Sequence, residues 1–408
     1  MEYTKNAIIR KNGQFTILGN IKTGKWIRIQ NALHEKFESQ LIGKGMEITD
    51  SDQKVWDLAK VLMELKVISE ENMEQGDTQE NKIRAVTFAI TNRCNLSCLH
   101  CGYSAGPDQN YELDKEAVLA ALTIMKDADV IGITGGEPMF HKDFEEIAAF
   151  IGKNMNGKKT LMTNATLIHE GNADLIVGNF DDVAISLDAA SEKTCDEMRG
   201  KGVYKKVVSA IKLLQSKNFK NISLSFSETE LNKHERDLFI RMCKEWQVKC
   251  VLRSFWAVGR GMENRSRLDM KVDAGKAAAM HPDPEKLTVY RKNLQLATRC
   301  GAGIHSIYIQ YNGDIYPCPV AGVDEKMKMG NIKDSEHFQS LLLNRDKTDG
   351  FKHYKNISCK EAGRCSACDV RDFCWRCLQE YYRIFKDSSQ DAVCTGRKNF
   401  LRSIVWGE

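Results

Sequence analysis

The chain has 408 residues, of which 42% are hydrophobic and 28% charged, and its formal net charge is +4. This composition fits a folded protein of two or three domains and excludes a chain that is disordered throughout. So small a net charge gives no basis for binding nucleic acid or an anionic membrane. No stretch approaches the about eighteen apolar residues of a membrane span, and the N-terminus lacks the pattern of a signal peptide, so we expect a cytoplasmic protein.

Residues 1–70 are predicted to form a small N-terminal domain. Turn signals at Asn12-Gly13 and Thr23-Gly24 divide an alternating pattern into three antiparallel strands, expected at 6–10, 14–18 and 25–30. Two helices are expected to follow, at 32–43 and at 51–65 after an Asp50 cap. Residues 71–83, part of a polar stretch that begins at 69, have the composition of a linker, which indicates an independent module.

Strand and helix patterns alternate through residues 84–261. The alternation predicts a parallel sheet with right-handed crossovers and a ligand site at the carboxyl ends of its strands. Six such units are too few for a complete eight-stranded barrel. The expected strands are 84–91, 130–134, 159–164, 182–187, 221–227 and 249–255, and the clearest helices are 115–126, 144–153, 204–217 and 233–246.

Three cysteines, Cys94, Cys98 and Cys101, follow the first of these strands as a CxxxCxxC run. Fourteen cysteines in a chain expected to stay in the reducing cytoplasm indicate metal binding rather than disulfides. Three thiolates at this spacing can each bind one iron of a cubane cluster and leave the fourth iron open to a substrate or cofactor. The alternative is structural zinc, but a closed zinc site needs four ligands, and the only local fourth candidate is His100.

The run resembles the signature of the radical S-adenosylmethionine (SAM) enzymes. In that family the amino and carboxylate groups of SAM chelate the open iron, and an aromatic residue commonly precedes the last cysteine, where His100 stands here. The resemblance implies a partial (β/α)6 barrel with a [4Fe-4S] cluster on these cysteines. It also implies a flavodoxin- or ferredoxin-like electron donor, cleavage of SAM to methionine and a 5′-deoxyadenosyl radical, and removal of a hydrogen atom from the substrate.

Residues at the ends of the later strands match the SAM contacts of this family in order. Gly135-Gly136-Glu137 matches the GGE motif that contacts the SAM amino group, and glycine lets a ligand approach the backbone closely. Arg199 matches an arginine that neutralises the SAM carboxylate, and the segment 259–261 resembles another recurring element. In the family, polar strand ends contact the methionyl carboxylate and the ribose, which here would be Thr163, Asn164, Ser186 and Asp188.

One residue departs from this pattern, because Ala189 stands where relatives often have glycine. The alternative from another class is a cluster-bearing electron carrier or binding protein. The series of SAM-contact residues argues against it, because an electron carrier needs no SAM pocket.

Of the eleven remaining cysteines, Cys195, Cys243 and Cys250 are expected to be small buried core residues. The other eight follow a predicted bridge at 262–299 and lie in the region 300–408. A β-hairpin is expected about Asn312-Gly313, with Cys318 just beyond it. CxxC pairs fit zinc ribbons, but eight cysteines can instead complete two four-thiolate iron-sulfur clusters.

This order of cysteines resembles the SPASM domain, which binds two auxiliary [4Fe-4S] clusters, so the resemblance implies three clusters in all. Cys374 and Cys377 are spaced CxxC where many relatives have CxxxC. If Cys359 does not reach the inner cluster, an open iron there could bind a substrate thiolate. The outer cluster is expected on Cys365, Cys368, Cys374 and Cys394, and the inner one on Cys300, Cys318, Cys377 and, as candidate fourth ligand, Cys359.

The N-terminal domain resembles the winged-helix-like leader-recognition domain of ribosomal peptide maturation systems, in which a leader peptide adds to a sheet edge. The alternative is an extension that only packs on the enzyme. Together these resemblances imply a maturase of the sactipeptide and ranthipeptide kind, which forms thioethers between a cysteine sulfur and a carbon of a precursor peptide. A carbon–carbon crosslink is the alternative within the class, and formylglycine formation is less favoured because such enzymes lack this head.

Overall fold

The computed structural model describes residues 1–42, 53–69, 82–270, 281–297, 300–357, 363–374, 377–379 and 391–407. The chain divides into two compact units. Unit 1 comprises Met1–Asp77, Val272–Cys300 and Ile357–Glu408, and unit 2 comprises Thr78–Lys271 and Gly301–Asn356. The region after residue 300 contributes to both units, and the predicted domain boundaries stay a prediction. Among the described residues, no helix has the length and apolar character needed to cross a membrane.

Unit 2 is built on a mixed sheet with the strand order β11-β10-β9-β8-β7-β6-β12-β13-β14. Its first six strands run parallel in chain order, which confirms the predicted α/β core. Five of these strands contribute buried apolar side chains to the core of unit 2, and the edge strand β11 is largely exposed. The six parallel strands are β6 (Ala85–Ala89), β7 (Val130–Thr134), β8 (Lys158–Thr163), β9 (Asp182–Ser186), β10 (Ile222–Glu228) and β11 (Lys249–Ser254).

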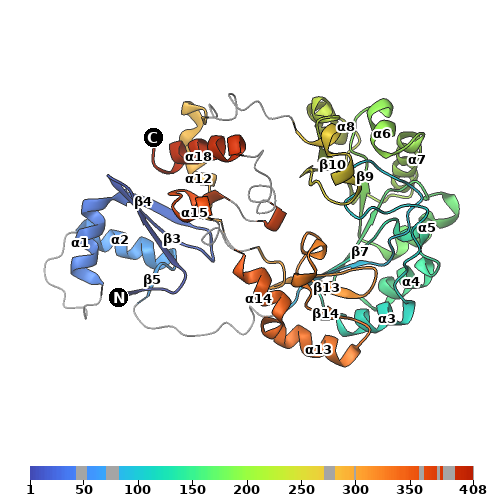
Figure 1. Ribbon diagram of the computed structural model, residues 1–408, viewed down its shortest axis with the longest axis horizontal. Coiled ribbons are helices and arrows are strands. Elements are labelled where there is room, and N and C mark those ends of the chain that lie inside the picture. Colours follow the sequence, from blue (N-terminus) through green and yellow to red (C-terminus); the bar gives the residue numbers. More distant parts are fainter. Residues whose placement is uncertain are drawn as a thin grey trace. The chain divides into compact units, whose positions relative to one another are not determined.

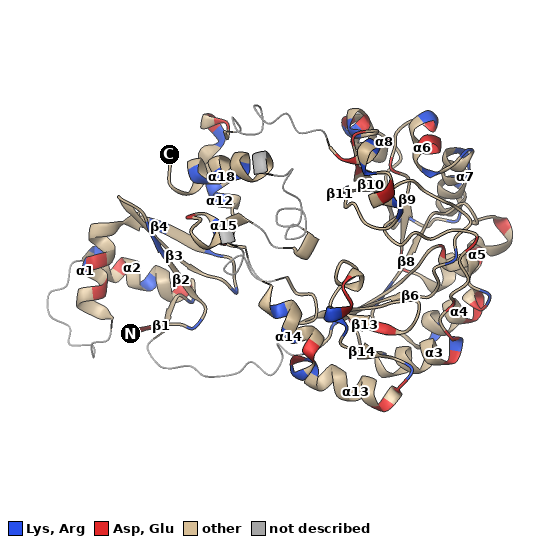
Figure 2. Cartoon of the chain, in the orientation of Figure 1, with Lys and Arg blue, Asp and Glu red and all other residues tan. Residues whose placement is uncertain are grey.

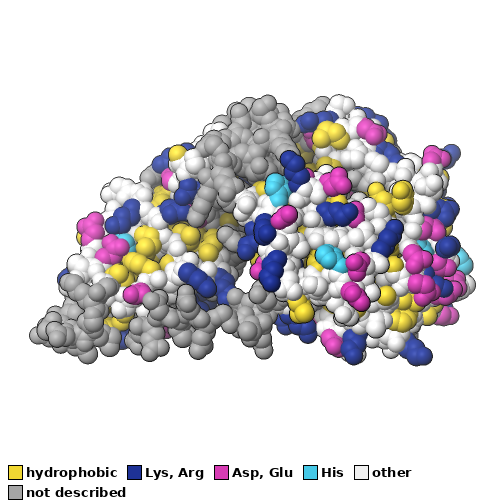
Figure 3. All heavy atoms as spheres, turned by 60° about the horizontal axis from the view of Figure 1, so that its bottom comes forward, with side chains coloured by type: hydrophobic (Ala, Val, Ile, Leu, Met, Phe, Trp, Pro, Cys, Tyr) yellow, Lys and Arg dark blue, Asp and Glu magenta, His cyan; other side chains and the backbone are white. Residues whose placement is uncertain are grey.

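Helices connect these strands and lie along the outer side of the sheet (Figure 1). They are α3 (Lys115–Ile124), α4 (Phe144–Asn154), α5 (Glu170–Asn179), α6 (Glu192–Arg199), α7 (Val203–Ser216) and α8 (Arg236–Glu245). The sequence did not predict α5 and α6, because α5 contains Gly171 and Gly178 and α6 is short and strongly polar. Charged residues concentrate on these helices (Figure 2), and the face drawn in Figure 3 mixes both signs over the described residues.

The predicted hairpin about Asn312-Gly313 is confirmed, and it belongs to the sheet of unit 2. Strand β12 (Ser306–Ile309) pairs in parallel with β6, so that Ile307 lies opposite Val86. Strands β13 (Asp314–Tyr316) and β14 (Gly330–Asn331) then continue the sheet with antiparallel pairing. Gly313 has φ +89°, which suits glycine in a tight turn. Helices α13 (Ser335–Asn344) and α14 (Asp349–Asn356) complete unit 2.

Unit 1 contains the predicted three-stranded antiparallel sheet, formed by β2 (Ala7–Lys11), β3 (Phe15–Asn20) and β4 (Trp26–Gln30). Helices α1 (Asn31–Leu41) and α2 (Gln53–Glu64) cover one face, where Leu18 packs with Phe37 and Leu62. The strand pair β1 (Glu2–Tyr3) and β5 (Ile68–Ser69) is too short to have left a pattern. The expected Asp50 cap and nearly all of the predicted linker lie outside the described residues.

The other face of this sheet packs on the C-terminal part of the chain. Ile17 of β3 contributes to an apolar core with Leu296, Phe373 and Trp406. The Trp26 indole donates a hydrogen bond to the Leu294 carbonyl at 2.7 Å. Because both faces are covered, the core of the N-terminal sheet is shared with residues from the end of the chain. Unit 1 also contains α12 (Leu287–Asn293) and the long helix α18 (Asp391–Val405).

Shorter elements complete the two units. In unit 2 they are the 3-10 helices η2 (Pro138–Phe140), η3 (Lys233–Glu235), η5 (Ala321–Val323), η6 (Glu325–Met327) and η7 (Arg345–Lys347) and the helical turns α9 (Arg260–Glu263) and α10 (Arg265–Leu268). In unit 1 they are η4 (Pro284–Lys286), α15 (Gly363–Ser366) and α16 (Arg371–Cys374).

Candidate functional site

The loop after β6 carries Cys94, Cys98 and Cys101, and hydrogen bonds from other elements fix it. The backbone N–H of Leu96 lies 3.4 Å from Cys94 Sγ, and the Asn164 amide at the end of β8 lies 3.7 Å from the same sulfur. The Leu99 N–H donates to the carbonyl of Met198 in α6 at 2.9 Å. The loop is thus tied to the carboxyl end of the sheet, where a parallel α/β fold places its ligand site.

Asp188, just past β9, is the centre of a buried charged group. Its carboxylate accepts from Arg199 Nε at 2.8 Å and also from Arg199 Nη2, and it lies 2.9 Å from His100 Nε2. The Ser227 N–H donates to its second oxygen at 2.5 Å. Burial alone would raise the pKa of Asp188, but Arg199 and His100 outweigh it and hold that pKa far below its usual range.

Glu137 forms a second buried centre at the end of β7. It accepts hydrogen bonds from the Thr163 hydroxyl and the Asn164 N–H, both at 2.7 Å, and from the Met139 N–H at 3.2 Å. Burial raises the pKa of Glu137 to about 7 despite these bonds. A Cβ at the neighbouring Gly136 would overlap the carbonyl of Arg93, so only glycine fits beside the cysteine loop.

The structure therefore gathers most of the predicted SAM-contact residues around the cysteine loop. His100, Glu137, Thr163, Asn164, Asp188 and Arg199 are joined to one another or to the cysteines by the contacts above, Gly135 and Gly136 lie against Thr91 and Arg93, and Ser186 ends β9. The carboxylates of Glu137 and Asp188 already accept hydrogen bonds from the protein. These two side chains organise the loop, and their contact with SAM remains a prediction.

Two residues that were not predicted as site residues also hold this loop. Arg260 donates to the carbonyls of Cys98 at 3.1 Å and Ala105 at 2.7 Å, and Asn264 donates to that of Leu99 at 3.2 Å. In the sequence, the segment 259–261 shows only a resemblance to a recurring element. That Arg260 binds the backbone of the cysteine loop is visible only in the folded structure. No sequence signal marked Asn264.

The chemistry of this loop fits an iron-sulfur cluster. Burial raises the pKa of the Cys94 thiol to about 12, so its sulfur ionises at neutral pH only when a cation binds there. N–H groups point at Cys94 Sγ and a guanidinium at Cys98 Sγ, as in a site built for thiolates. Within the described segments, no group of three His, Cys, Asp or Glu side chains is arranged to bind a single metal ion. A cubane cluster has a different geometry, because each thiolate binds a separate iron.

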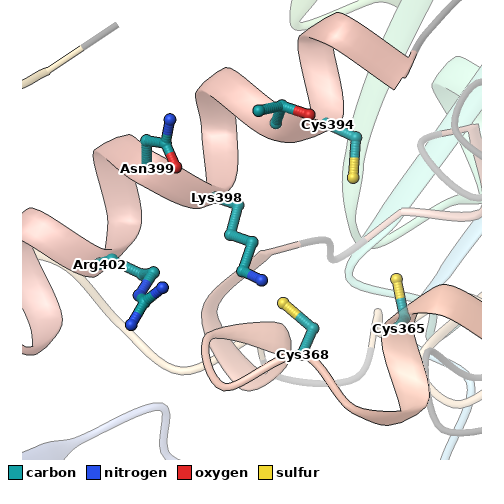
Figure 4. Close-up of a pocket in the computed structure, with 7 residues that line it drawn as sticks. Cys365, Cys368, Cys394, Lys398, Asn399 and Arg402 are labelled. Atoms are coloured by element: carbon teal, nitrogen blue, oxygen red, sulfur yellow. The ribbon is translucent and has the colours of Figure 1, made fainter. Parts of the chain in front are cut away.

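A second cluster of cysteines lies in unit 1, around a pocket of about 440 Å³. Its lining includes the thiols of Cys365, Cys368 and Cys394, which point toward a common space beside the Lys398 amine (Figure 4). Cys374 is close enough for their charges to act on it: burial is the main cause that raises its pKa to about 12, and the other three thiols contribute to this rise. The four residues predicted for the outer cluster are thus neighbours in one unit.

The residues predicted for the inner cluster are distributed differently. Cys300 and Cys377 belong to unit 1, and Cys318 belongs to unit 2, two residues after the end of β13. Cys359 lies outside the described residues. Their joint ligation of one cluster therefore stays a prediction.

The site lies on a parallel sheet. Three cysteines occupy the loop after its first strand, glycines follow the second strand, and buried polar residues lie at the next strand ends. This combination is typical of enzymes that use SAM with an iron-sulfur cluster. Family models agree with this geometry. Residues 88–240 match the radical SAM superfamily, and residues 300–369 match SPASM, an iron-sulfur cluster-binding domain. The protein is a radical SAM enzyme with a SPASM domain.

Similar proteins share much of this chain. The mycofactocin maturase MftC of Mycolicibacterium smegmatis is 27% identical over 304 residues, which cover 71% of this chain and 76% of that protein. The antilisterial bacteriocin subtilosin biosynthesis protein AlbA of Bacillus subtilis is 24% identical over 383 residues, which cover 83% of this chain and 81% of that protein.

Solved structures show the same fold. The crystal structure of Streptococcus suis SuiB bound to precursor peptide SuiA matches with a TM-score of 0.57 at 15% identity, covering 99% of both chains. The structure of native anSMEcpe with bound AdoMet matches with a TM-score of 0.54 at 16% identity, covering 79% of this chain and 97% of that one.

Proposed function

We propose that this protein is a maturase that installs intramolecular thioether crosslinks, from a cysteine sulfur to a carbon, in a ribosomally made precursor peptide. The observation that carries the proposal is the combination, in one chain, of the cysteine loop, a SPASM domain and an N-terminal three-stranded sheet. Relatives with maturase or bacteriocin-biosynthesis names span most of the chain, which supports a peptide substrate.

In this proposal Cys94, Cys98 and Cys101 hold the cluster that binds SAM. The backbone of Gly135 and Gly136 meets the methionine end of SAM, and the missing Cβ atoms let this turn pack against Thr91 and Arg93 beside the cysteine loop. When bound, SAM and the clusters supply a hydrogen-abstracting 5′-deoxyadenosyl radical and an acceptor for the remaining electron, which balances the loss of two hydrogens from the peptide.

The auxiliary clusters follow the SPASM pattern. Cys365, Cys368, Cys374 and Cys394 line or adjoin one pocket, which supports their ligation of the outer cluster. Cys300, Cys318 and Cys377 bind the inner cluster, with Cys359 as its fourth ligand. Iron and sulfide analysis of Cys359→Ala, reconstituted without oxygen, tests that ligand: an unchanged iron content and absorption spectrum would exclude it.

The N-terminal sheet recognises the leader of the precursor peptide. Among the described residues, β2 and β4 each pair with β3 alone, so the outer edge of either strand can accept an extended peptide. Main-chain hydrogen bonds would then provide affinity, and neighbouring side chains selectivity. A flavodoxin- or ferredoxin-like protein of the cytoplasm donates the electron.

Two other products compete with the thioether, and one reaction distinguishes all three. The protein is incubated with SAM, a reductant and its precursor peptide, and the peptide is then analysed by mass spectrometry before and after thiol alkylation. A thioether lowers the mass by about two hydrogens and consumes one alkylatable thiol, because the sulfur enters the new bond. A carbon–carbon crosslink lowers the mass equally but leaves the thiol, and formylglycine replaces the thiol by an aldehyde.

A further inference from the structure

Two arginines from different elements converge on Cys98. Arg199, at the end of α6, places Nη1 3.9 Å from Cys98 Sγ. Arg260, at the start of α9, donates from Nη1 to the Cys98 carbonyl oxygen at 3.1 Å. A single cysteine of the loop therefore lies beside two permanent positive charges, since arginine stays protonated in proteins.

The charge on Arg199 is fixed in place by Asp188. The carboxylate binds Nε at 2.8 Å and also Nη2, and it is itself completely buried. Asp188 has φ +61°, an uncommon conformation for a residue other than glycine, and Asn232 donates to its carbonyl at 2.7 Å. The surrounding structure thus holds Asp188, and through it Arg199, in one position without help from a cofactor.

The charge on Arg260 is fixed by the loop itself. Its second terminal nitrogen donates to the carbonyl of Ala105 at 2.7 Å, so that one guanidinium bridges two points on either side of Cys101. Gly259 has φ +53°, and a Cβ there would press on the carbonyls of Cys101 and Gly102. The turn that presents Arg260 is therefore packed directly against the cysteine loop.

Positive charges in these positions favour the reduced form of a cluster, which carries one more negative charge than the oxidised form. Hydrogen bonds to cluster sulfurs act in the same direction. The carbonyl oxygen of Arg199 lies 3.7 Å from Cys98 Sγ and acts oppositely. It contributes only a partial charge, against the full charge of a guanidinium at a similar distance. The Asp188 carboxylate also opposes the two arginines at Cys98, but its influence there is smaller than that of Arg199, so the sum of the three charges stays positive.

We propose that Arg199 and Arg260 raise the reduction potential of the cluster on Cys94, Cys98 and Cys101 before SAM binds. This inference rests on the proposed ligation by these cysteines and gives Arg199 a function in addition to its expected contact with the SAM carboxylate. Arg199 acts through a hydrogen bond to Cys98 Sγ, Arg260 acts through its charge at the Cys98 carbonyl, and Asp188 positions Arg199.

The test is a redox titration of the reconstituted protein, followed by electron paramagnetic resonance in the absence of SAM. The signal that is missing from the Cys94→Ala, Cys98→Ala, Cys101→Ala triple variant identifies this cluster among the others. In Arg199→Gln and Arg260→Gln, we expect the ratio of reduced to oxidised cluster at a given potential to fall at least tenfold, which is a midpoint about 59 mV more negative for one electron. Arg199→Lys keeps the charge and should recover part of this loss.

Arg84→Gln is the matched control, because it removes the same charge from an exposed ion pair with Asp129 at the opposite end of β6. Its midpoint should equal that of the wild type. Unchanged midpoints in both Arg199→Gln and Arg260→Gln would overturn the inference, even if SAM binding weakens. If Arg199→Gln does not retain the cluster, the midpoint of Arg260→Gln decides.

A signal that persists in the triple cysteine variant would instead contradict the proposed cluster ligands. That outcome is distinct from an unchanged midpoint in the arginine variants. The two failures are therefore separately recognisable.

Discussion

The Thr163 hydroxyl donates a hydrogen bond to the Glu137 carboxylate at 2.7 Å, and this bond joins the carboxyl ends of β7 and β8. The same carboxylate accepts from the N–H of Asn164, whose side-chain amide lies 3.7 Å from Cys94 Sγ. A buried carboxylate is thus connected through one residue to the first cysteine of the loop. The GGE pattern predicts contact with a cofactor, and the structure adds this support of the cysteine loop.

Glu137→Gln should change how stability depends on pH. Because the pKa of Glu137 is raised from 4.5 to about 7, the folded state binds more protons than the unfolded state between these values. The free energy of unfolding of the wild type therefore falls, relative to that of the variant, as pH rises through this window. At about 1.4 kcal/mol per pH unit the whole fall is about 3.5 kcal/mol, and above the window the difference no longer changes with pH. Thermal unfolding at pH 5 and pH 8 measures the difference. Glu116→Gln on the exposed face of α3 is the control, and parallel pH dependence of wild type and Glu137→Gln would contradict the assignment.

Asp188→Asn should strongly destabilise unit 2. The substitution leaves the buried guanidinium of Arg199 without its partner, and breaking a buried ion pair in this way costs about 3–5 kcal/mol. Hydrogen exchange of the amides in β9 and α6 gives the change in the free energy of opening. Glu192→Gln breaks the exposed pair with Lys205 and should cost at most about 1 kcal/mol. Equal effects of the two substitutions would refute the importance of the buried pair.

The strands of unit 2 could be predicted because each is a short apolar run between turn signals, and the hairpin because Asn312-Gly313 requires a specific turn. The site is different, because its hydrogen bonds join residues far apart in the chain. Arg260 and Cys98 are 162 positions apart, and no local pattern connects them. The shared core of unit 1 could not be predicted for the same reason. Ile17 and Trp406 each suit an apolar environment, but only the fold brings them into one core.

Ile17→Ala tests whether the N-terminal sheet and the C-terminal helix stabilise each other. Ile17 is fully buried against Leu401 and Val405, and removing its side chain should cost about 2–5 kcal/mol. Hydrogen exchange of α18 should accelerate, although the substitution lies in β3. Val61→Ala, at an exposed position of α2, should leave exchange in α18 unchanged. Unchanged exchange in the Ile17 variant would contradict a shared core. Deletion of residues 1–70 would also remove part of the core that packs on α18. Point variants in the N-terminal sheet therefore test peptide recognition better than that deletion.

Gln30→Pro tests leader recognition at the edge of β4. Gln30 has φ −70°, which proline adopts without strain, and in the register with β3 its N–H faces away from the sheet. Fluorescence anisotropy of a labelled precursor peptide should show weaker binding to this variant, by about tenfold if one hydrogen bond is lost. Gln30→Ala keeps the N–H and is the control. Lys11→Pro removes an outward N–H from β2 and makes the same test of the other edge, and full affinity in both proline variants would refute recognition by β-strand addition.

The most direct test of the central claim is the reaction itself, measured with SAM, a reductant and any short cysteine-containing peptide encoded next to this protein. We predict 5′-deoxyadenosine, a peptide lighter by about two hydrogens per crosslink, and one cysteine thiol per crosslink that no longer reacts with an alkylating agent. Cys94→Ala should form none of these products. A peptide of unchanged mass, with 5′-deoxyadenosine formed or not, would contradict the proposed maturase, and a lighter peptide with every thiol still reactive would contradict the thioether.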